Sequence, residues 1–168
     1  MSITDNIKAG FLRRKKHATN KRSVILKKPD AFSKILIVTE KENDSLLRNV
    51  ETSFPNAEIN ALFLRKEKED KSTKFRFTVH PSDFNLTGHL KNDKLTKLIQ
   101  TEFDLVLDLS RDSVFLNEMT SRIKNTLFVG RMNQDSDSRY DLFFTGESDD
   151  EFLNHTVKQL KLLTKNER

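Results

Sequence analysis

Residues 34–40 read KILIVTE, and the four consecutive apolar residues at positions 35–38 decide the fold class. An apolar run without alternation is typical of a strand that is buried on both faces, as in a parallel sheet covered by helices on both sides. A second strongly buried strand is predicted at residues 102–110, EFDLVLDLS, around the apolar residues 105–107. Two such strands predict an α/β protein.

Helical patterns alternate with the strands. Pro55 ends the first helical pattern, in which four apolar residues share one face, namely Leu46, Leu47, Val50 and Phe54. Three further helices are predicted, the first after the candidate cap Asn92 and the second after Asp112 or Ser113. The third begins at Ser148, which forms a capping box with Glu151. Its buried face is an apolar stripe of Phe152, Leu153, Val157, Leu160 and Leu163. Further strands are predicted at residues 57–65, 74–80 (half exposed or at an edge), 126–131 and 140–146. This order predicts an open, mostly parallel, Rossmann-like α/β sheet flanked by helices.

Positive charge is concentrated at the N-terminus. The net charge is +5, but residues 1–34 hold ten Lys or Arg and two acids, whereas the rest of the chain holds 20 Lys or Arg and 23 acids. We therefore divide the chain into a basic N-terminal arm, residues 1–30, and a single α/β domain, residues 31–168. A localised excess of this kind points to a polyanionic partner for the arm.

The centre of the arm is the cationic segment FLRRKKHATNKR, residues 11–22. Ile3, Ile7 and Phe11 recur every four residues and predict a short amphipathic helix that leads into it. Lys and Arg contacts to phosphates release counterions and give salt-dependent affinity. We predict binding to RNA or the ribosome through Arg13, Arg14, Lys15, Lys16, Lys21, Arg22, Lys27 and Lys28. Two alternatives stay open, a solvated charged surface and, because of the apolar helix face, an anionic membrane surface.

Signatures of catalysis are absent from the sequence. There is no cysteine, so thiolate zinc sites, disulfides and cysteine nucleophiles are excluded. The four glycines, at positions 10, 88, 130 and 146, are not clustered as phosphate-binding loops require. His80 and His89 flank a loop without a carboxylate pattern, and no metal site is predicted. We expect no cofactor and no catalytic residue, hence a non-enzymatic protein. No apolar run reaches about 20 residues and no secretory signal is present, so we expect a cytoplasmic protein.

One region is a candidate ligand pocket. Ser110, Arg111 and Asp112 follow one buried strand, and Gly130 and Arg131 end the next. Ligands of open α/β sheets bind at the carboxyl ends of the strands, so a small molecule or a nucleotide is the alternative function. The structural interpretation is preferred, in which Asp112 or Ser113 caps a helix, Arg111 pairs with a carboxylate and Gly130 allows a tight turn.

Several short motifs carry a resemblance to known proteins. They are GHLK at residues 88–91, FDLVL at 103–107, FVG at 128–130 and DL at 141–142. With these motifs, residues 75–165 resemble a family of small uncharacterised Bacteroidetes proteins, which implies a fold and a lineage but no catalytic residue. Residues 104–109 and 129–131 also resemble the N-terminal half of heptosyltransferase-type glycosyltransferases. Since the nucleotide-sugar site of those enzymes lies largely in a second domain, this resemblance implies a fold without the activity.

Overall fold

The computed structural model describes residues 8–9, 23–67, 72–110, 113–131, 140–144 and 148–165. The elements follow one another as η1 (Pro29–Ala31), β1 (Lys34–Thr39), α2 (Asp44–Ser53), β2 (Glu58–Leu64), β3 (Arg76–Val79), η2 (Pro81–Asp83), α3 (Asp93–Gln100), β4 (Glu102–Asp108), α4 (Val114–Thr120), β5 (Lys124–Arg131), β6 (Leu142–Phe144) and α5 (Asp149–Leu163). Apart from the two short 3-10 helices η1 and η2, this is the predicted alternation of strands and helices.

The six described strands form one sheet in the order β3-β2-β1-β4-β5-β6. All neighbouring pairs are parallel, which confirms the predicted open sheet. β3 lies at one edge, as its alternating sequence predicted. The order is that of Rossmann-like folds, in which the direction of winding reverses between β1 and β4. The carboxyl ends of these two strands, Thr39 and Asp108, therefore lie at the position where such sheets usually bind ligands.

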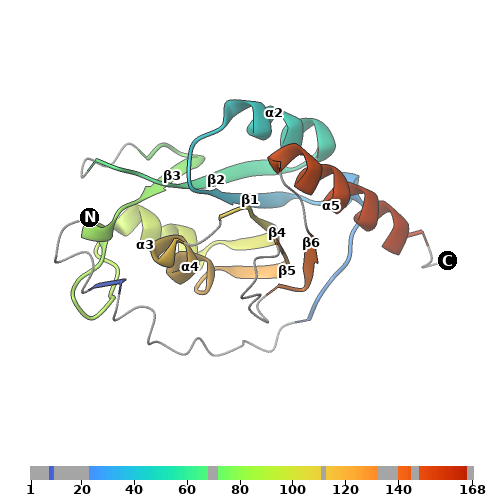
Figure 1. Cartoon of the computed structure of the whole chain (residues 1–168). Helices are drawn as coiled ribbons and strands as arrows, with labels where there is room; N and C mark the ends of the chain where they lie inside the picture. Colours follow the sequence, from blue (N-terminus) through green and yellow to red (C-terminus); the bar gives the residue numbers. More distant parts are fainter. Residues whose placement is uncertain are drawn as a thin grey trace.

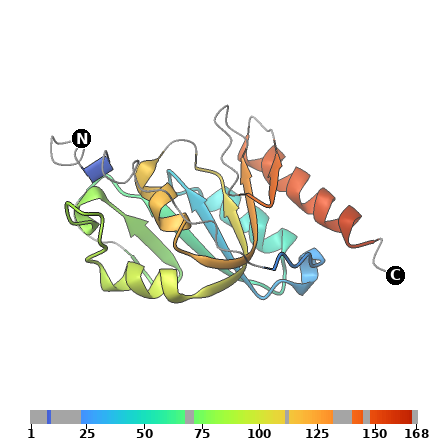
Figure 2. The same ribbon diagram turned by 90° about the horizontal axis from the view of Figure 1, so that it is seen from below.

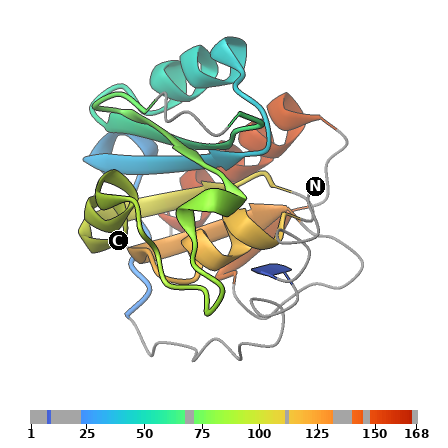
Figure 3. The same cartoon turned by 90° about the vertical axis from the view of Figure 1, so that its left-hand side faces the viewer.

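Helices cover both faces of the sheet. Figure 1 shows α2 and α5 on one face and α3 and α4 on the other, and Figure 3 gives the same layers from the side. Successive β1 residues contribute alternately to the two cores, Ile35 and Ile37 under α2 and α5, Leu36 and Val38 under α3 and α4. This double burial explains why the strand is apolar at consecutive positions.

Side-chain caps fix the starts of the helices. Asn92 accepts hydrogen bonds from the first turn of α3, and Ser148 and Glu151 form the predicted capping box at α5. Ser113 caps α4 by accepting from Leu116 N, which decides between the two candidate caps. The predicted apolar stripe of α5 is right except at Leu163, which is 39% exposed because the helix extends past the sheet.

Candidate functional site

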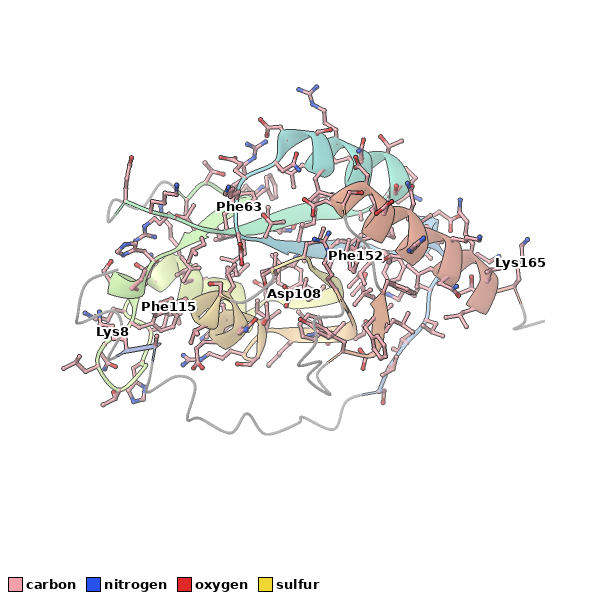
Figure 4. The ribbon with its side chains drawn as sticks, viewed as in Figure 1. Lys8, Phe63, Asp108, Phe115, Phe152 and Lys165 are labelled. Carbon is pink, nitrogen blue, oxygen red and sulfur yellow. The ribbon has the colours of Figure 1, made fainter. Side chains whose placement is uncertain are left out.

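The structure brings three residues of the predicted pocket together at the carboxyl edge of the sheet. Ser110 follows β4, while Gly130 and Arg131 end β5, and the two strands are in register at Asp108 and Gly130. Figure 4 shows Asp108 at this edge, between the helix layers. Arg111 and Asp112 lie outside the described residues. All three residues that can be placed here are buried.

Asp108 organises the β4 end of this edge. Its carboxylate is fully buried, and Oδ1 accepts hydrogen bonds from the Ser110 backbone N at 3.0 Å and from Ser110 Oγ at 2.5 Å. Oδ2 accepts from the Tyr140 hydroxyl at 3.1 Å. A buried carboxylate needs such donors to offset its lost hydration. The Ser110 side chain, a candidate ligand contact in the sequence, therefore takes part in a hydrogen-bond network within the protein.

Gly130 has a different role from the predicted one. It lies within β5 rather than in a tight turn, and Gly88 is the glycine with positive φ among the described residues. The Tyr140 ring occupies the space where a side chain at position 130 would begin. Gly130 is thus required for close packing of Tyr140, which also stacks edge-on against Phe128 at a centroid distance of 4.9 Å.

Arg131 is held by the start of α5. Its side chain is 6% exposed, and Nη2 donates to Asp149 at 2.8 Å while the guanidinium lies 5.7 Å from the centre of the Phe152 ring. Nε is buried without a hydrogen-bond partner in the part of the chain that the structure describes. The first turn of α5 also carries Asp150 and Glu151. This surplus of negative charge opposes the binding of an anion beside Arg131.

A cleft that the sequence did not predict lies beside β2 and β3. It has a volume of about 350 Å³, and its walls include Glu42, Phe63, Arg65 and Arg76. Both arginines are paired. Arg65 Nη2 donates to Asp83 at 2.9 Å, with both side chains 8% exposed, and Arg76 donates to Glu42 at 2.6 Å. The only signal in the sequence was the alternation in β3, which places Arg76 and Thr78 on the face away from Phe77.

The described residues of the basic arm contact the domain at two places. Lys8 Nζ donates to the Pro81 carbonyl at 3.0 Å, and Ala9 packs against the core under α3 and α4. At the second place, the Ile25 N donates to the Thr126 carbonyl at 3.3 Å, and Leu26 packs against the core under α2 and α5. We call these places the first and second anchor of the arm.

Lys27 and Asp104 fix the second anchor. Lys27 Nζ donates to Asp104 Oδ1 at 2.7 Å, and Oδ2 accepts from the Ser33 backbone N at 2.7 Å and the Lys34 backbone N at 3.3 Å. Burial alone would raise the pKa of Asp104, but the hydrogen bonds from Lys27 and Ser33 outweigh it and lower the pKa below its usual value. Lys27 thus holds the arm to the domain through its ion pair with Asp104, whereas Lys28 is exposed.

The other predicted nucleic-acid contacts lie between the two anchors. Arg13, Arg14, Lys15, Lys16, Lys21 and Arg22 are outside the described residues, as are Ile3, Ile7 and Phe11 of the predicted helix. Lys8 and Ala9, which fall within that predicted helix, are helical. The chain therefore contacts the domain at Ala9, continues through the cationic segment, and contacts the domain again from Ile25 onward.

The described residues contain no group of three or more His, Asp or Glu side chains that could hold a metal ion. His80 is buried, and its Nδ1 accepts from the Ser82 backbone N at 3.1 Å, whereas His89 is exposed. No described helix has the length and apolar character that crossing a membrane requires.

Comparison with known proteins places the chain in a protein family. No curated protein and no solved structure matches the chain. A family model described as a family of unknown function (DUF6913) matches residues 4–164, which include most of the basic arm together with the α/β domain. The chain belongs to this family, DUF6913.

Proposed function

We propose that the chain is a non-enzymatic RNA-binding protein that uses its cationic segment, residues 11–22, and that the ribosome is the site where it binds. The observation that carries the proposal is the concentration of six Lys or Arg in twelve residues between two anchors on a domain that holds more acids than bases. Each cation that contacts a phosphate releases counterions, and six such contacts give strong, salt-sensitive binding.

The anchors favour this function physically. Because Ala9 and Ile25 contact the domain, both ends of the cationic segment start from fixed points on its surface. A segment held at both ends has less conformational freedom to lose when it binds than a free tail. Lys27 is used at the second anchor, so the phosphate contacts are assigned to the six cations within residues 11–22 and to Lys28.

The alternative function, binding of a small molecule or nucleotide by a degenerate glycosyltransferase half, has less support. Ser110 and Arg131 would be its ligand contacts, and both side chains already bind acids of the protein itself, Asp108 and Asp149. A ligand anion there would also face the acidic first turn of α5. Cytoplasmic location and origin within the Bacteroidetes stay predictions.

Co-sedimentation with ribosomes from the native cell tests the proposal. The full chain is compared with a variant in which Arg13, Arg14, Lys15, Lys16, Lys21 and Arg22 are replaced by Gln, because deletion of residues 1–28 would also remove both anchors. A matched control replaces six exposed cations of the domain by Gln, namely Lys41, Arg48, Lys66, Lys158, Lys161 and Lys165. It has the same net charge as the first variant.

We expect the wild type and the control to sediment with ribosomes at low salt, and the segment variant to remain in the supernatant. Nuclease treatment should release the wild type. Sedimentation of the segment variant with the wild type would overturn the proposal. Flotation of the wild type with vesicles of anionic phospholipid, lost in the segment variant, would instead support the membrane alternative.

A further inference from the structure

The carboxyl end of α5 and the second anchor lie on the same side of the domain. Because β6 is parallel to β5, the helix that follows it runs back to the amino edge of the sheet, where it contacts η1. Residues 23–28 reach this edge too, since Ile25 N donates to the Thr126 carbonyl near the start of β5. Figures 1 and 2 show both segments in the right-hand half of the molecule. We call their exposed side chains the amino-edge surface, namely Val24, Ile25, Lys28, Lys158, Lys161, Leu162, Leu163 and Lys165.

The amino-edge surface carries four exposed apolar side chains. Val24 is 48% exposed, Ile25 and Leu162 are both 46% exposed, and Leu163 is 39% exposed. The hydrogen bond of Ile25 to Thr126 uses its backbone N and leaves the side chain in solvent. Seven large apolar side chains are exposed in the described part of the chain, so more than half of them gather on this surface. Exposed apolar side chains that gather in this way mark a contact with a protein or a membrane.

Lysines flank these apolar side chains. Lys158, Lys161 and Lys165 are exposed and recur at intervals of three and four residues, so they share one face of α5 with Leu162. Figure 4 shows Lys165 beyond the end of this helix. Residues 23–31 and 152–165 together contain five lysines and one acid, Asp30. The surface is therefore both apolar and cationic.

The acids of α5 do not neutralise this surface. They are Asp149, Asp150 and Glu151, all in the first turn. Ten positions, about 15 Å of helix, separate Glu151 from Lys161. This separation exceeds the Debye length of about 8 Å at physiological ionic strength, so the lysines attract an anionic surface almost independently of the acids.

The combination of lysines with aliphatic side chains fits a lipid bilayer better than a nucleic acid. Phosphates of RNA bind lysines, and RNA bases stack on aromatic rings, but Val24, Ile25, Leu162 and Leu163 have no ring on which a base can stack. At the surface of an anionic bilayer both kinds of side chain gain. Apolar side chains enter the boundary between headgroups and acyl chains, and lysines are attracted by anionic headgroups.

We infer that the amino-edge surface docks on a membrane of anionic phospholipids. Val24, Ile25, Leu162 and Leu163 insert at the level of the headgroups, and the lysines of α5 bind the phospholipid phosphates around them. This inference is independent of the proposed function, because RNA binding is assigned to residues 11–22 and Lys28, whereas the contact with lipid depends on the end of α5.

The test is flotation of the full chain, freed of RNA by nuclease, with vesicles of phosphatidylglycerol and phosphatidylcholine and with vesicles of phosphatidylcholine alone. One variant carries Lys158→Gln, Lys161→Gln and Lys165→Gln, and its matched control carries Lys41→Gln, Lys66→Gln and Lys91→Gln, at three exposed lysines away from this surface. A second variant, Leu162→Gln, is matched by Leu86→Gln, at a leucine that is 53% exposed between η2 and α3. Thermal unfolding of each variant checks that the domain is folded.

A lysine near an anionic bilayer contributes about fivefold to affinity, so loss of the three α5 lysines should weaken binding to the anionic vesicles roughly 100-fold. Leu162→Gln should weaken it about fivefold, because an inserted leucine is replaced by a polar side chain. Both controls, and the variant in which the six cations of residues 11–22 are replaced by Gln, should float with the wild type.

Failure of the wild type to float with anionic vesicles would overturn the inference and leave the proposed function intact. Flotation of the α5 lysine variant at the wild-type level would overturn it too. Loss of RNA binding instead of vesicle binding in that variant would assign the surface to RNA and would equally contradict the inference.

Discussion

Asp104 offers the sharpest test of how the basic arm is attached to the domain. Its carboxylate accepts from Lys27 Nζ at 2.7 Å and from the backbone N of Ser33 at 2.7 Å and of Lys34 at 3.3 Å. Hydrogen bonds to charged groups contribute about 1.5–3 kcal/mol each. The side-chain amide of Asn at this position has one acceptor oxygen and can keep only some of these three hydrogen bonds. Asp104→Asn keeps the shape and removes the charge, so we expect a loss of about 2 kcal/mol.

The pH dependence of this loss has a defined sign. Burial raises the pKa of Asp104, but the hydrogen bonds from Lys27 and Ser33 and the positive charge of Lys27 together outweigh it, so the pKa is lowered in the folded protein. A carboxyl group of this kind stabilises the fold fully above its unfolded pKa, about 3.9, and loses that contribution as pH falls through the folded value. The stability difference between wild type and Asp104→Asn should therefore be largest near neutral pH and shrink in acid.

Urea unfolding from pH 7 down to pH 3 measures this difference, and hydrogen exchange of the Ile25 amide reports the anchor itself. Ile25 N donates to Thr126, so release of the arm should speed its exchange in the variant. Asp30→Asn, at an exposed aspartate near the same anchor, is the control and should have little effect. A loss that stays constant with pH, or an unchanged Ile25 exchange rate, would refute the reasoning.

Further predictions concern the buried contacts. Gly130→Ala should lower the free energy of unfolding by about 1–3 kcal/mol by overpacking against Tyr140. In a Tyr140→Ala background the same substitution should cost much less, and an equal cost in both backgrounds would contradict this explanation. Arg65→Met leaves Asp83 buried without its cation and should cost about 3–5 kcal/mol, whereas Arg76→Met breaks exposed pairs with Glu42 and Asp44 and should change the melting temperature little. Ser113→Ala removes the α4 cap and should lower the free energy of unfolding in urea by about 1 kcal/mol. Ser113→Thr keeps a hydroxyl acceptor at this position and should retain most of that stability.

The fold was largely predictable because its signals are local. The continuous apolar runs at residues 35–38 and 105–107 reflect burial on both faces of β1 and β4, and capping side chains such as Asn92 and Ser148 mark helix starts. These features depend on a few neighbouring residues. The strand order, with β1 at the centre, depends on pairings between distant segments, and no local pattern encodes it.

The candidate site was less predictable, for physical reasons. Ser110, Gly130 and Arg131 were expected at one edge of the sheet, and they are there, but their partners Tyr140 and Asp149 come from later segments. Tertiary packing therefore decided whether these residues face a ligand or one another. The ion pair between Lys27 and Asp104 spans 77 positions, so nothing near Lys27 in the sequence distinguished it from the other cations of the arm.

The salt dependence of RNA binding by the cationic segment tests the central claim most directly. Six phosphate contacts with a single strand give a slope of log K against log salt concentration of about −4. We predict that the full chain shows at least this slope, and that replacement of Arg13, Arg14, Lys15, Lys16, Lys21 and Arg22 by Gln reduces the slope by about 4 and weakens binding. An unchanged slope and affinity in this variant would contradict the account.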